Sequence, residues 1–112
     1  MMDKKRTHWL RGILDLCVLA ALSNEERYGY ELAQYLEESG LGKIKGGTLY
    51  PLLARLEKAG QVTTHWREGS QGPSRKYYAL TPSGIDSLNT HSKQWSSFTD
   101  SVHNILLKQR NK

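Results

Sequence analysis

The chain has 112 residues, 38% of them hydrophobic, and its 16 Lys and Arg against 11 Asp and Glu give a formal net charge of +5. A chain of this length forms one small domain that buries only about two-thirds of its unfolded surface, so dimerisation would add apolar burial. No apolar run is long enough for a membrane span and no signal peptide is recognisable, so we expect a cytoplasmic protein whose basic charge favours a polyanionic partner.

The N-terminal part predicts an arm and a core helix. Residues 1–8 are polar and basic and suggest a loosely ordered arm. From Trp9 to Ser23 apolar residues cover nearly the whole circumference of a helix, which is typical of a helix packed on several sides. The single cysteine, Cys17, lies in this run and is expected to be a small buried hydrophobe; a redox-sensing thiol is the alternative.

Two further helices are predicted. One runs from about Tyr30 to near Gly40, and the next starts close to Thr48, a candidate N-cap, with Pro51 in its first turn. The apolar residues of the latter recur at helical spacing: Leu49, Leu52, Leu53 and Leu56. Because a glycine-containing turn at 42–47 joins these helices, they predict a helix-turn-helix unit whose second member faces a DNA groove.

A β-hairpin is expected next. Residues 61–66 alternate as in a half-buried strand, residues 68–74 form a polar tip with two glycines, and a return strand opens at Arg75. Successive strand residues point to opposite faces, so parity with Leu80 makes Tyr78 the core residue and turns Tyr77 outward. A helix followed by a two-stranded ribbon predicts a winged helix.

The last predicted element is a long helix. Thr81 and Pro82 form a helix start, and the helix then runs to about Gln109. Its apolar or small positions step by threes and fours: Ile85, Leu88, Ser92, Trp95, Thr99, Val102 and Leu106, with Phe98 and Ile105 widening the stripe. The predicted body is too small to cover this stripe, so we interpret it as a dimerisation surface that also packs on residues 10–22 of the partner.

Two segments carry a family resemblance. The first is Gly47-Thr48-Leu49-Tyr50-Pro51-Leu52-Leu53 with Arg55-Leu56-Glu57 and Gly60; the second is Gly72-Pro73, Arg75-Lys76-Tyr77-Tyr78, Leu80-Thr81 and Gly84. Together they resemble the PadR family of bacterial transcriptional regulators, from Arg11 to about Gln109. The resemblance implies that the first segment is the recognition helix and the second belongs to the wing. It also suggests the short branch of the family, with a single C-terminal helix, which includes repressors that sense lipophilic or aromatic compounds through a tryptophan on this helix.

The candidate DNA-binding residues lie on the third helix and the wing, where hydroxyl, guanidinium and ammonium groups can reach bases or phosphates. They are Thr48, Tyr50, Pro51, Arg55, Gly72, Arg75 and Lys76. Two alternatives stay open. Tyr50 and Pro51 could simply pack against the preceding helix, and Arg55 could pair with Glu57 or Glu38.

A candidate effector site centres on Trp95, whose neighbours along the stripe, Ser92 and Thr99, are too small to fill an interface. In a symmetric dimer this suggests a gap that could stack a planar aromatic ligand. The expected lining is Phe98, Val102, Leu14 and Val18. The alternative is that Trp95 is a packing residue of an obligate dimer.

The sequence therefore predicts a mainly α protein with a small β-hairpin: a basic arm at 1–8, a winged helix-turn-helix at 9–81 and a C-terminal dimerisation helix at 82–112. No catalytic motif, cofactor motif or metal-ligand set is recognisable. We expect a homodimeric DNA-binding repressor that recognises an inverted repeat and is released by an aromatic or lipophilic ligand. The alternatives are a winged-helix protein-interaction module and a drug-binding dimer without a specific operator.

Overall fold

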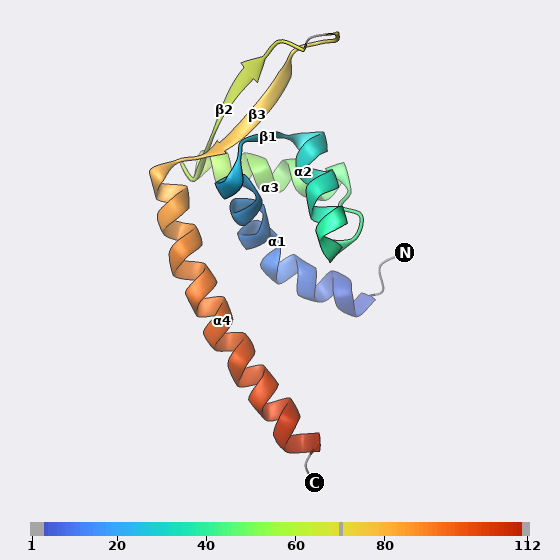
Figure 1. Ribbon diagram of the computed structural model, residues 1–112, viewed down its shortest axis with the longest axis vertical. Helices are drawn as coiled ribbons and strands as arrows, with labels where there is room; N and C mark the ends of the chain where they lie inside the picture. The colour runs from blue at the N-terminus through green and yellow to red at the C-terminus, as the bar shows by residue number, and fades with distance from the viewer. Residues whose placement is uncertain (1–3, 70, 111–112) are drawn as a thin grey trace.

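A computed structural model describes residues 4–69 and 71–110 (Figure 1). The elements in chain order are α1 (Lys4–Asn24), β1 (Arg27–Tyr28), α2 (Gly29–Leu36), the short π-helical turn η1 (Glu37–Leu41), α3 (Gly46–Lys58), β2 (Val62–Arg67), β3 (Arg75–Leu80) and α4 (Pro82–Arg110). The fold is mainly helical with a small antiparallel sheet, as predicted, and ends in a long helix. None of the helices in these residues is both long and apolar enough to cross a membrane.

The core lies where α1, α2 and α3 meet below the sheet. Val18, Leu32 and Leu53 are fully buried and come from one helix each. The helical spacing predicted for the third helix is confirmed, because all four of its apolar residues are buried: Leu49, Leu52, Leu53 and Leu56. The recognition helix of the predicted helix-turn-helix is therefore fixed to the body by one apolar stripe, which leaves its opposite side free.

The sheet has three strands in the order β1-β3-β2, all antiparallel, rather than the two of the predicted hairpin. The added strand, β1, has only two residues and pairs Arg27 with Tyr78. Tyr78 is buried and Tyr77 is not, so the parity prediction for these two tyrosines is confirmed. Residues paired directly across strands share a face, so Trp66 lies beside Lys76 on the α3 side and Arg67 lies beside Arg75 on the other.

Thr81 joins the sheet to α4 at the predicted helix start and caps the helix. Its side chain accepts a hydrogen bond from the amide of Gly84 (3.0 Å) and donates one to the carbonyl of Gly60 (2.6 Å). A single threonine therefore holds the start of α4 against the turn between α3 and β2.

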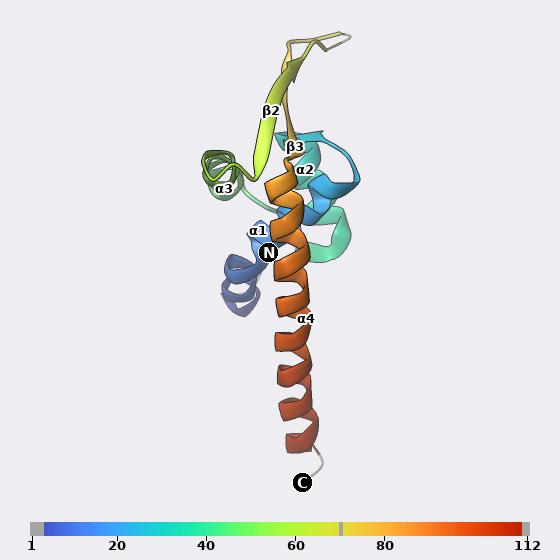
Figure 2. The same ribbon diagram turned by 90° about the vertical axis from the view of Figure 1, so that its left-hand side faces the viewer.

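The helix α4 extends well beyond the body (Figures 1 and 2). The radius of gyration is 16.3 Å, compared with about 13 Å for a compact chain of this length. A helix of 29 residues is about 44 Å long, and only its first part meets the other elements. Its outer part exposes large apolar side chains: Phe98, Val102, Ile105, Leu106 and Leu107.

Two predicted helix starts are wrong. Helix α1 begins at Lys4 rather than Trp9, so residues 4–8 of the predicted arm are helical; residues 1–3 lie outside the described residues. Helix α3 begins at Gly46 with Lys45 at the N-cap position, so Thr48 is not the cap and Pro51 lies beyond the first turn. Both Pro51 and Gly47 are exposed, so the carbonyl that loses its helical partner at Pro51 can be solvated.

Candidate nucleic-acid interface

The outer face of α3 carries three of the predicted DNA-binding residues. Thr48, Pro51 and Arg55 are all exposed, and their spacing places them on one side of the helix, opposite its buried leucines. Within the described part of the chain Arg55 forms no ion pair, so neither of its alternative partners holds it. This face therefore presents a hydroxyl group and a guanidinium group to solvent.

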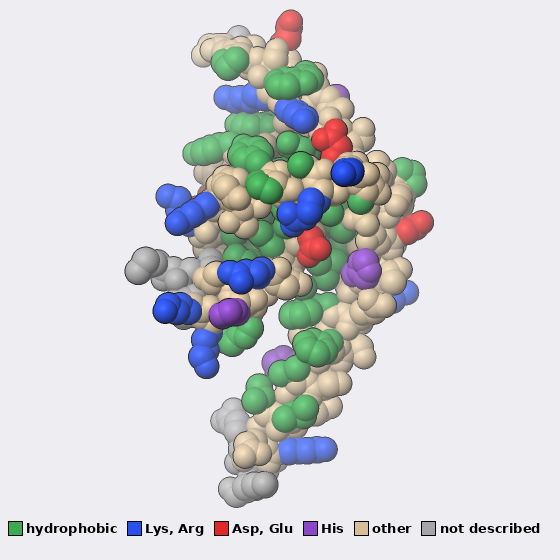
Figure 3. Space-filling view, turned by 180° about the vertical axis from the view of Figure 1, so that it is seen from behind, with side chains coloured by type: hydrophobic (Ala, Val, Ile, Leu, Met, Phe, Trp, Pro, Cys, Tyr) green, Lys and Arg blue, Asp and Glu red, His purple; other side chains and the backbone are tan. Residues whose placement is uncertain are grey.

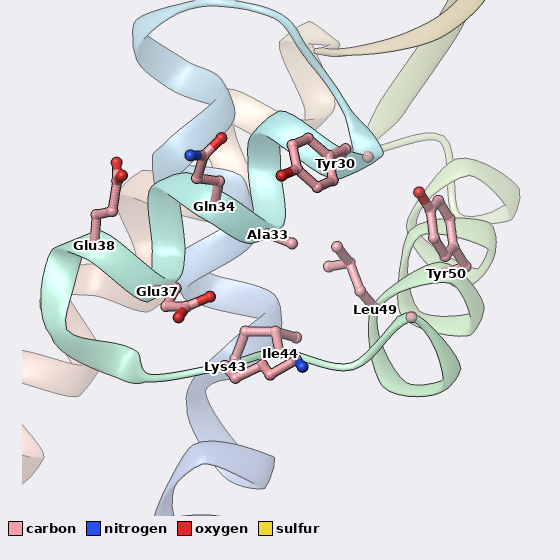
Figure 4. A pocket seen from close by; sticks show the side chains of 11 residues that line it. Tyr30, Ala33, Gln34, Glu37, Glu38, Lys43, Ile44, Leu49 and Tyr50 are labelled. Atoms are coloured by element: carbon pink, nitrogen blue, oxygen red, sulfur yellow. The ribbon is translucent and has the colours of Figure 1, made fainter. Parts of the chain in front are cut away.

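Tyr50, the fourth candidate on α3, both packs and remains accessible. Its side chain is 50% exposed, yet its ring lies against Gly29 at the start of α2, where a Cβ would come 2.3 Å from the tyrosine hydroxyl oxygen. Figure 4 shows Tyr30 and Tyr50 on the α2 and α3 sides of a pocket of about 370 Å³, with Glu37 and Glu38 on its far side. One edge of the Tyr50 ring thus packs on Gly29 and the other lies beside Gly46, so the packing interpretation holds for a residue that is still half exposed.

Arg75 and Lys76 open β3 and point to opposite faces of the sheet. The guanidinium of Arg75 lies 4.5 Å from the centre of the Tyr28 ring, and its Nη1 donates to the Tyr28 hydroxyl (2.9 Å). The ammonium of Lys76 lies 3.8 Å from Glu57 Oε1 on α3, and Glu57 Oε2 accepts from the Thr64 hydroxyl (3.0 Å). Glu57 therefore connects α3 to both strands of the wing.

The other face of the wing is held by Glu26, which precedes β1. Its carboxylate pairs with Arg67 and lies 3.1 Å from Nε2 of His65. The Arg67 guanidinium also lies 4.2 Å from the centre of the Tyr77 ring. The strands of the wing are thus tied to the body on both faces. At its tip Gly72 is exposed, while Ser70 lies outside the described residues.

One exposed aromatic residue of the wing was missed as a candidate. Trp66 is 67% exposed and lies beside Lys76 on the face of the sheet that continues into α3. The predicted alternation of residues 61–66 already places Trp66 on the same face of the strand as Val62 and Thr64. A large aromatic residue at the outer end of this face was the signal for a binding residue. Figure 3 views the molecule from the α3 side and shows Lys and Arg side chains spread over this face, with few Asp and Glu between them.

The predicted effector residues are only partly brought together. Trp95 and Phe98 on α4 have ring centres 6.1 Å apart and line an open cleft of about 420 Å³ between α1 and α4. Val102 is exposed further along α4 and does not line this cleft. Within the described residues, no three His, Cys, Asp or Glu side chains converge on a metal site.

Leu14 and Val18 were predicted on the wrong face. They are 3% and 0% exposed because they point into the core shared with α2 and α3, whereas the apolar α1 residues that line the cleft with Trp95 are Ile13, Leu16 and Leu19. Cys17 is half-buried, and this burial, with a smaller contribution from Asp15, raises the pKa of its thiol. The thiol is therefore held in its less reactive protonated form.

Comparisons with known proteins agree with this architecture. Residues 18–90 match the model of the transcriptional regulator PadR-like family. A PadR-like transcriptional regulator from Bacillus cereus has 36% identity and a TM-score of 0.81, covering 88% of this chain and 96% of its own. A Streptococcus transcriptional regulator has 40% identity and a TM-score of 0.78, with 87% and 95% covered. A transcriptional regulator of Mycobacterium tuberculosis is 35% identical over 78 residues, which are 70% of this chain and 71% of that protein. The chain belongs to the PadR-like family of DNA-binding transcriptional regulators, and is not an enzyme.

Proposed function

We propose that this protein is a homodimeric repressor that reads an operator with α3 and its wing and releases it when a ligand binds near Trp95. The main support is the continuous face formed by the outer side of α3 and the side of the wing that carries Trp66 and Lys76. An α-helix fits the major groove, where Thr48 and Arg55 can contact base edges. Lys76 on this face and the backbone of Gly72 at the tip then contact phosphates, and Arg75 adds positive charge on the opposite face of the wing.

Dimerisation is supported by the apolar stripe of α4. Large apolar side chains that no described residue covers, such as Ile105 and Leu106, are costly on a soluble monomer. Packing the stripe on its symmetry mate buries them and places two copies of α3 about one helical turn of DNA apart. The operator is therefore expected to be an inverted repeat, and occupying a promoter in this way gives repression.

The effector is an aromatic or lipophilic compound that stacks on Trp95 and Phe98 in the cleft between α1 and α4. Because this cleft borders the helix that sets the spacing of the two α3 helices, a ligand there can change that spacing. It releases DNA only if it binds the wrongly spaced form more tightly, since equal affinity for both forms shifts no equilibrium.

The proposal is tested by fluorescence anisotropy with DNA from immediately upstream of the protein's own gene and a scrambled fragment of the same composition. The wild-type dimer should bind the first fragment in the presence of excess scrambled competitor. Arg55→Ala should remove this preference, whereas Lys108→Ala on α4 should leave it unchanged. Equal binding of both fragments by the wild type would contradict the proposal that the protein recognises a specific operator in this DNA.

The effector part has its own readout. Planar aromatic compounds should quench the tryptophan fluorescence and lower the operator affinity of the wild type. Trp95→Phe should keep the dimer and the operator affinity but weaken both ligand effects. A Trp95→Phe protein that is monomeric by size-exclusion chromatography would instead assign Trp95 to packing alone.

A further inference from the structure

A second side of α1 faces away from the effector cleft and borders a groove. Ile13 and Leu16 line the cleft that contains Trp95, whereas Arg6, Leu10 and Arg11 line a groove of about 870 Å³ on the other side. The opposite wall of the groove is the connection from η1 to α3, and its far end reaches Thr48. The groove is therefore continuous with the outer face of the recognition helix.

The groove has an apolar floor and a basic rim. Its floor contains Leu10, Leu14 and Ile44. Four cationic side chains line it, against a single carboxylate from Glu37: Arg6, Arg11, Lys43 and Lys45. The guanidinium of Arg6 donates to the carbonyl of Gly40 (2.7 Å), which ties the first turns of α1 to the end of η1. The rim of the groove therefore carries an excess of positive charge, and the Arg6 hydrogen bond fixes its two walls relative to each other.

The start of α3 adds to this positive character. Lys45 occupies the N-cap position, no side chain of the described residues caps the helix, and its first turn contains no acidic residue. Lys45 and the exposed Thr48 of the first turn both line the groove, so the start of α3 borders it directly. Amides at a helix start favour an anion close by, so the backbone and the basic side chains act in the same direction.

The groove also lies on the same side of the molecule as the recognition helix. In Figure 2, α3 and the first turns of α1 project to the same side of α4. A recognition helix in the major groove lies between two sugar-phosphate backbones. The wing lies toward one end of α3 and this groove borders the other, so the two surfaces can contact the two backbones separately.

We propose that the groove between the start of α1 and the start of α3 seats a stretch of DNA backbone next to the half-site, with Arg11, Lys43 and Lys45 neutralising its phosphates. This inference rests on the proposed function and adds to it a second phosphate-binding surface besides the wing. These contacts add affinity for any DNA sequence and hold the recognition helix in register, because phosphates carry no base identity.

The test compares two variants that lose the same charge. Lys43→Gln with Lys45→Gln removes two groove cations, and Lys93→Gln with Lys108→Gln removes two cations of α4. For each, the affinity for operator and scrambled DNA is measured from about 50 to 200 mM salt, a range over which each phosphate contact changes affinity about threefold. For the groove variant, the slope of log affinity against log salt concentration should fall by about two units on both DNAs, and the ratio of operator affinity to scrambled-DNA affinity should stay the same. The α4 variant should keep the wild-type slope.

A second measurement locates the contact on the DNA. Operators with methylphosphonates flanking the half-site lack the charges that the groove would neutralise, so they should weaken wild-type binding more than binding of the groove variant, which retains only Arg11 of the three proposed cations. Equal salt slopes for the two variants, or a groove variant that loses its dimer instead of its slope, would overturn the inference. If the wild type binds operator and scrambled DNA equally well, the proposed function is contradicted but the groove is not. The salt slopes on scrambled DNA would still show whether the groove binds phosphates.

Discussion

The hydroxyl oxygen of Tyr50 occupies the space into which a side chain at position 29 would project, only 2.3 Å from an ideal Cβ on Gly29. Any side chain at position 29 would therefore require the Tyr50 ring to move. The Tyr50 ring packs on the start of α2 because position 29 has no side chain.

Gly29→Ala should consequently impair DNA binding more than folding. The methyl group pushes the Tyr50 ring outward, an overpacking effect of about 1 to 3 kcal/mol that rotation of the ring partly relieves. The free energy of operator binding should therefore change by more than the free energy of unfolding. In a Tyr50→Ala background the same change should be nearly silent, because the clashing ring is gone. The wild type, the two single variants and the double variant are compared by DNA-binding anisotropy and by denaturant unfolding. If the losses of the two single variants simply add in the double variant, the contact between positions 29 and 50 is contradicted.

Glu57 brings a negative charge close to the DNA-binding face while it holds Lys76. Both side chains are partly exposed, so their ion pair contributes only about 0.2 to 1 kcal/mol to stability. Glu57→Gln keeps an acceptor for Thr64 and frees Lys76, so we expect tighter binding of every DNA sequence and a steeper salt slope. Asp86→Asn makes the same charge change on α4 and should alter neither. Unchanged binding by Glu57→Gln would mean that Lys76 does not contact DNA.

Trp66 should matter to DNA binding but not to folding. Its side chain is 67% exposed, so Trp66→Ala removes little buried area and should change the free energy of unfolding by about 0.5 kcal/mol or less. On the α3 face of the wing the ring can lie flat on the sugar-phosphate backbone, so operator affinity should fall by about 1 kcal/mol or more. Trp66→Phe keeps an aromatic face and should retain most of the affinity. Titration of operator DNA with both variants decides this.

Sequence patterns predicted the parts of this fold that follow a single periodicity. The leucine stripe of α3, the inward position of Tyr78 and the cap at Thr81 each depend on spacing or residue type alone, and each is confirmed. The missed strand β1 is only two residues long, which is too short to show alternation. Its place is set by pairing with β3, a contact between segments far apart in the sequence.

The errors on α1 and α3 have different physical causes. Helix α1 is apolar nearly all round, so its sequence does not indicate which residues face the core, and Leu14 and Val18 could not be told from Ile13 and Leu16. The start of α3 was misplaced because glycine is a poor helix former, yet packing of Leu49 fixes the first turn from Gly46 onward. At the start of α3, tertiary packing therefore overrides local propensity.

The stability of the fold should decline at high pH through Tyr78. Burial, with Tyr50 and Glu57 nearby, raises the pKa of this phenol above its ordinary value of 10.0. The folded protein therefore holds the proton more tightly than the unfolded chain does, so this stabilisation is complete below pH 10 and is lost as the pH rises through the folded pKa. Tyr78→Phe should lose less stability between neutral and alkaline pH than the wild type. Denaturant unfolding at a series of pH values checks this, and parallel curves would contradict it.

Two glycine-to-alanine changes should affect stability in opposite directions. A Cβ on Gly84 would lie 2.1 Å from the carbonyl oxygen of Gln61, and because the clash is with backbone, no side-chain rotation relieves it. The same junction is held by Thr81, which bonds both Gly60 and Gly84, so α4 cannot move away without losing these bonds. Gly84→Ala should therefore destabilise the protein by about 3 kcal/mol.

Gly12 supplies the matched control, because it lies within α1, is exposed, and has no atom within 4 Å of an added Cβ. Gly12→Ala should raise the free energy of unfolding by about 0.5 to 1 kcal/mol, the difference in helix propensity. The two variants and the wild type are unfolded at the same protein concentration, since the proposed dimerisation would make stability depend on concentration. A Gly84→Ala protein as stable as wild type would mean that α4 can shift on the turn after α3. In that case the spacing of the two recognition helices would not be fixed by this junction.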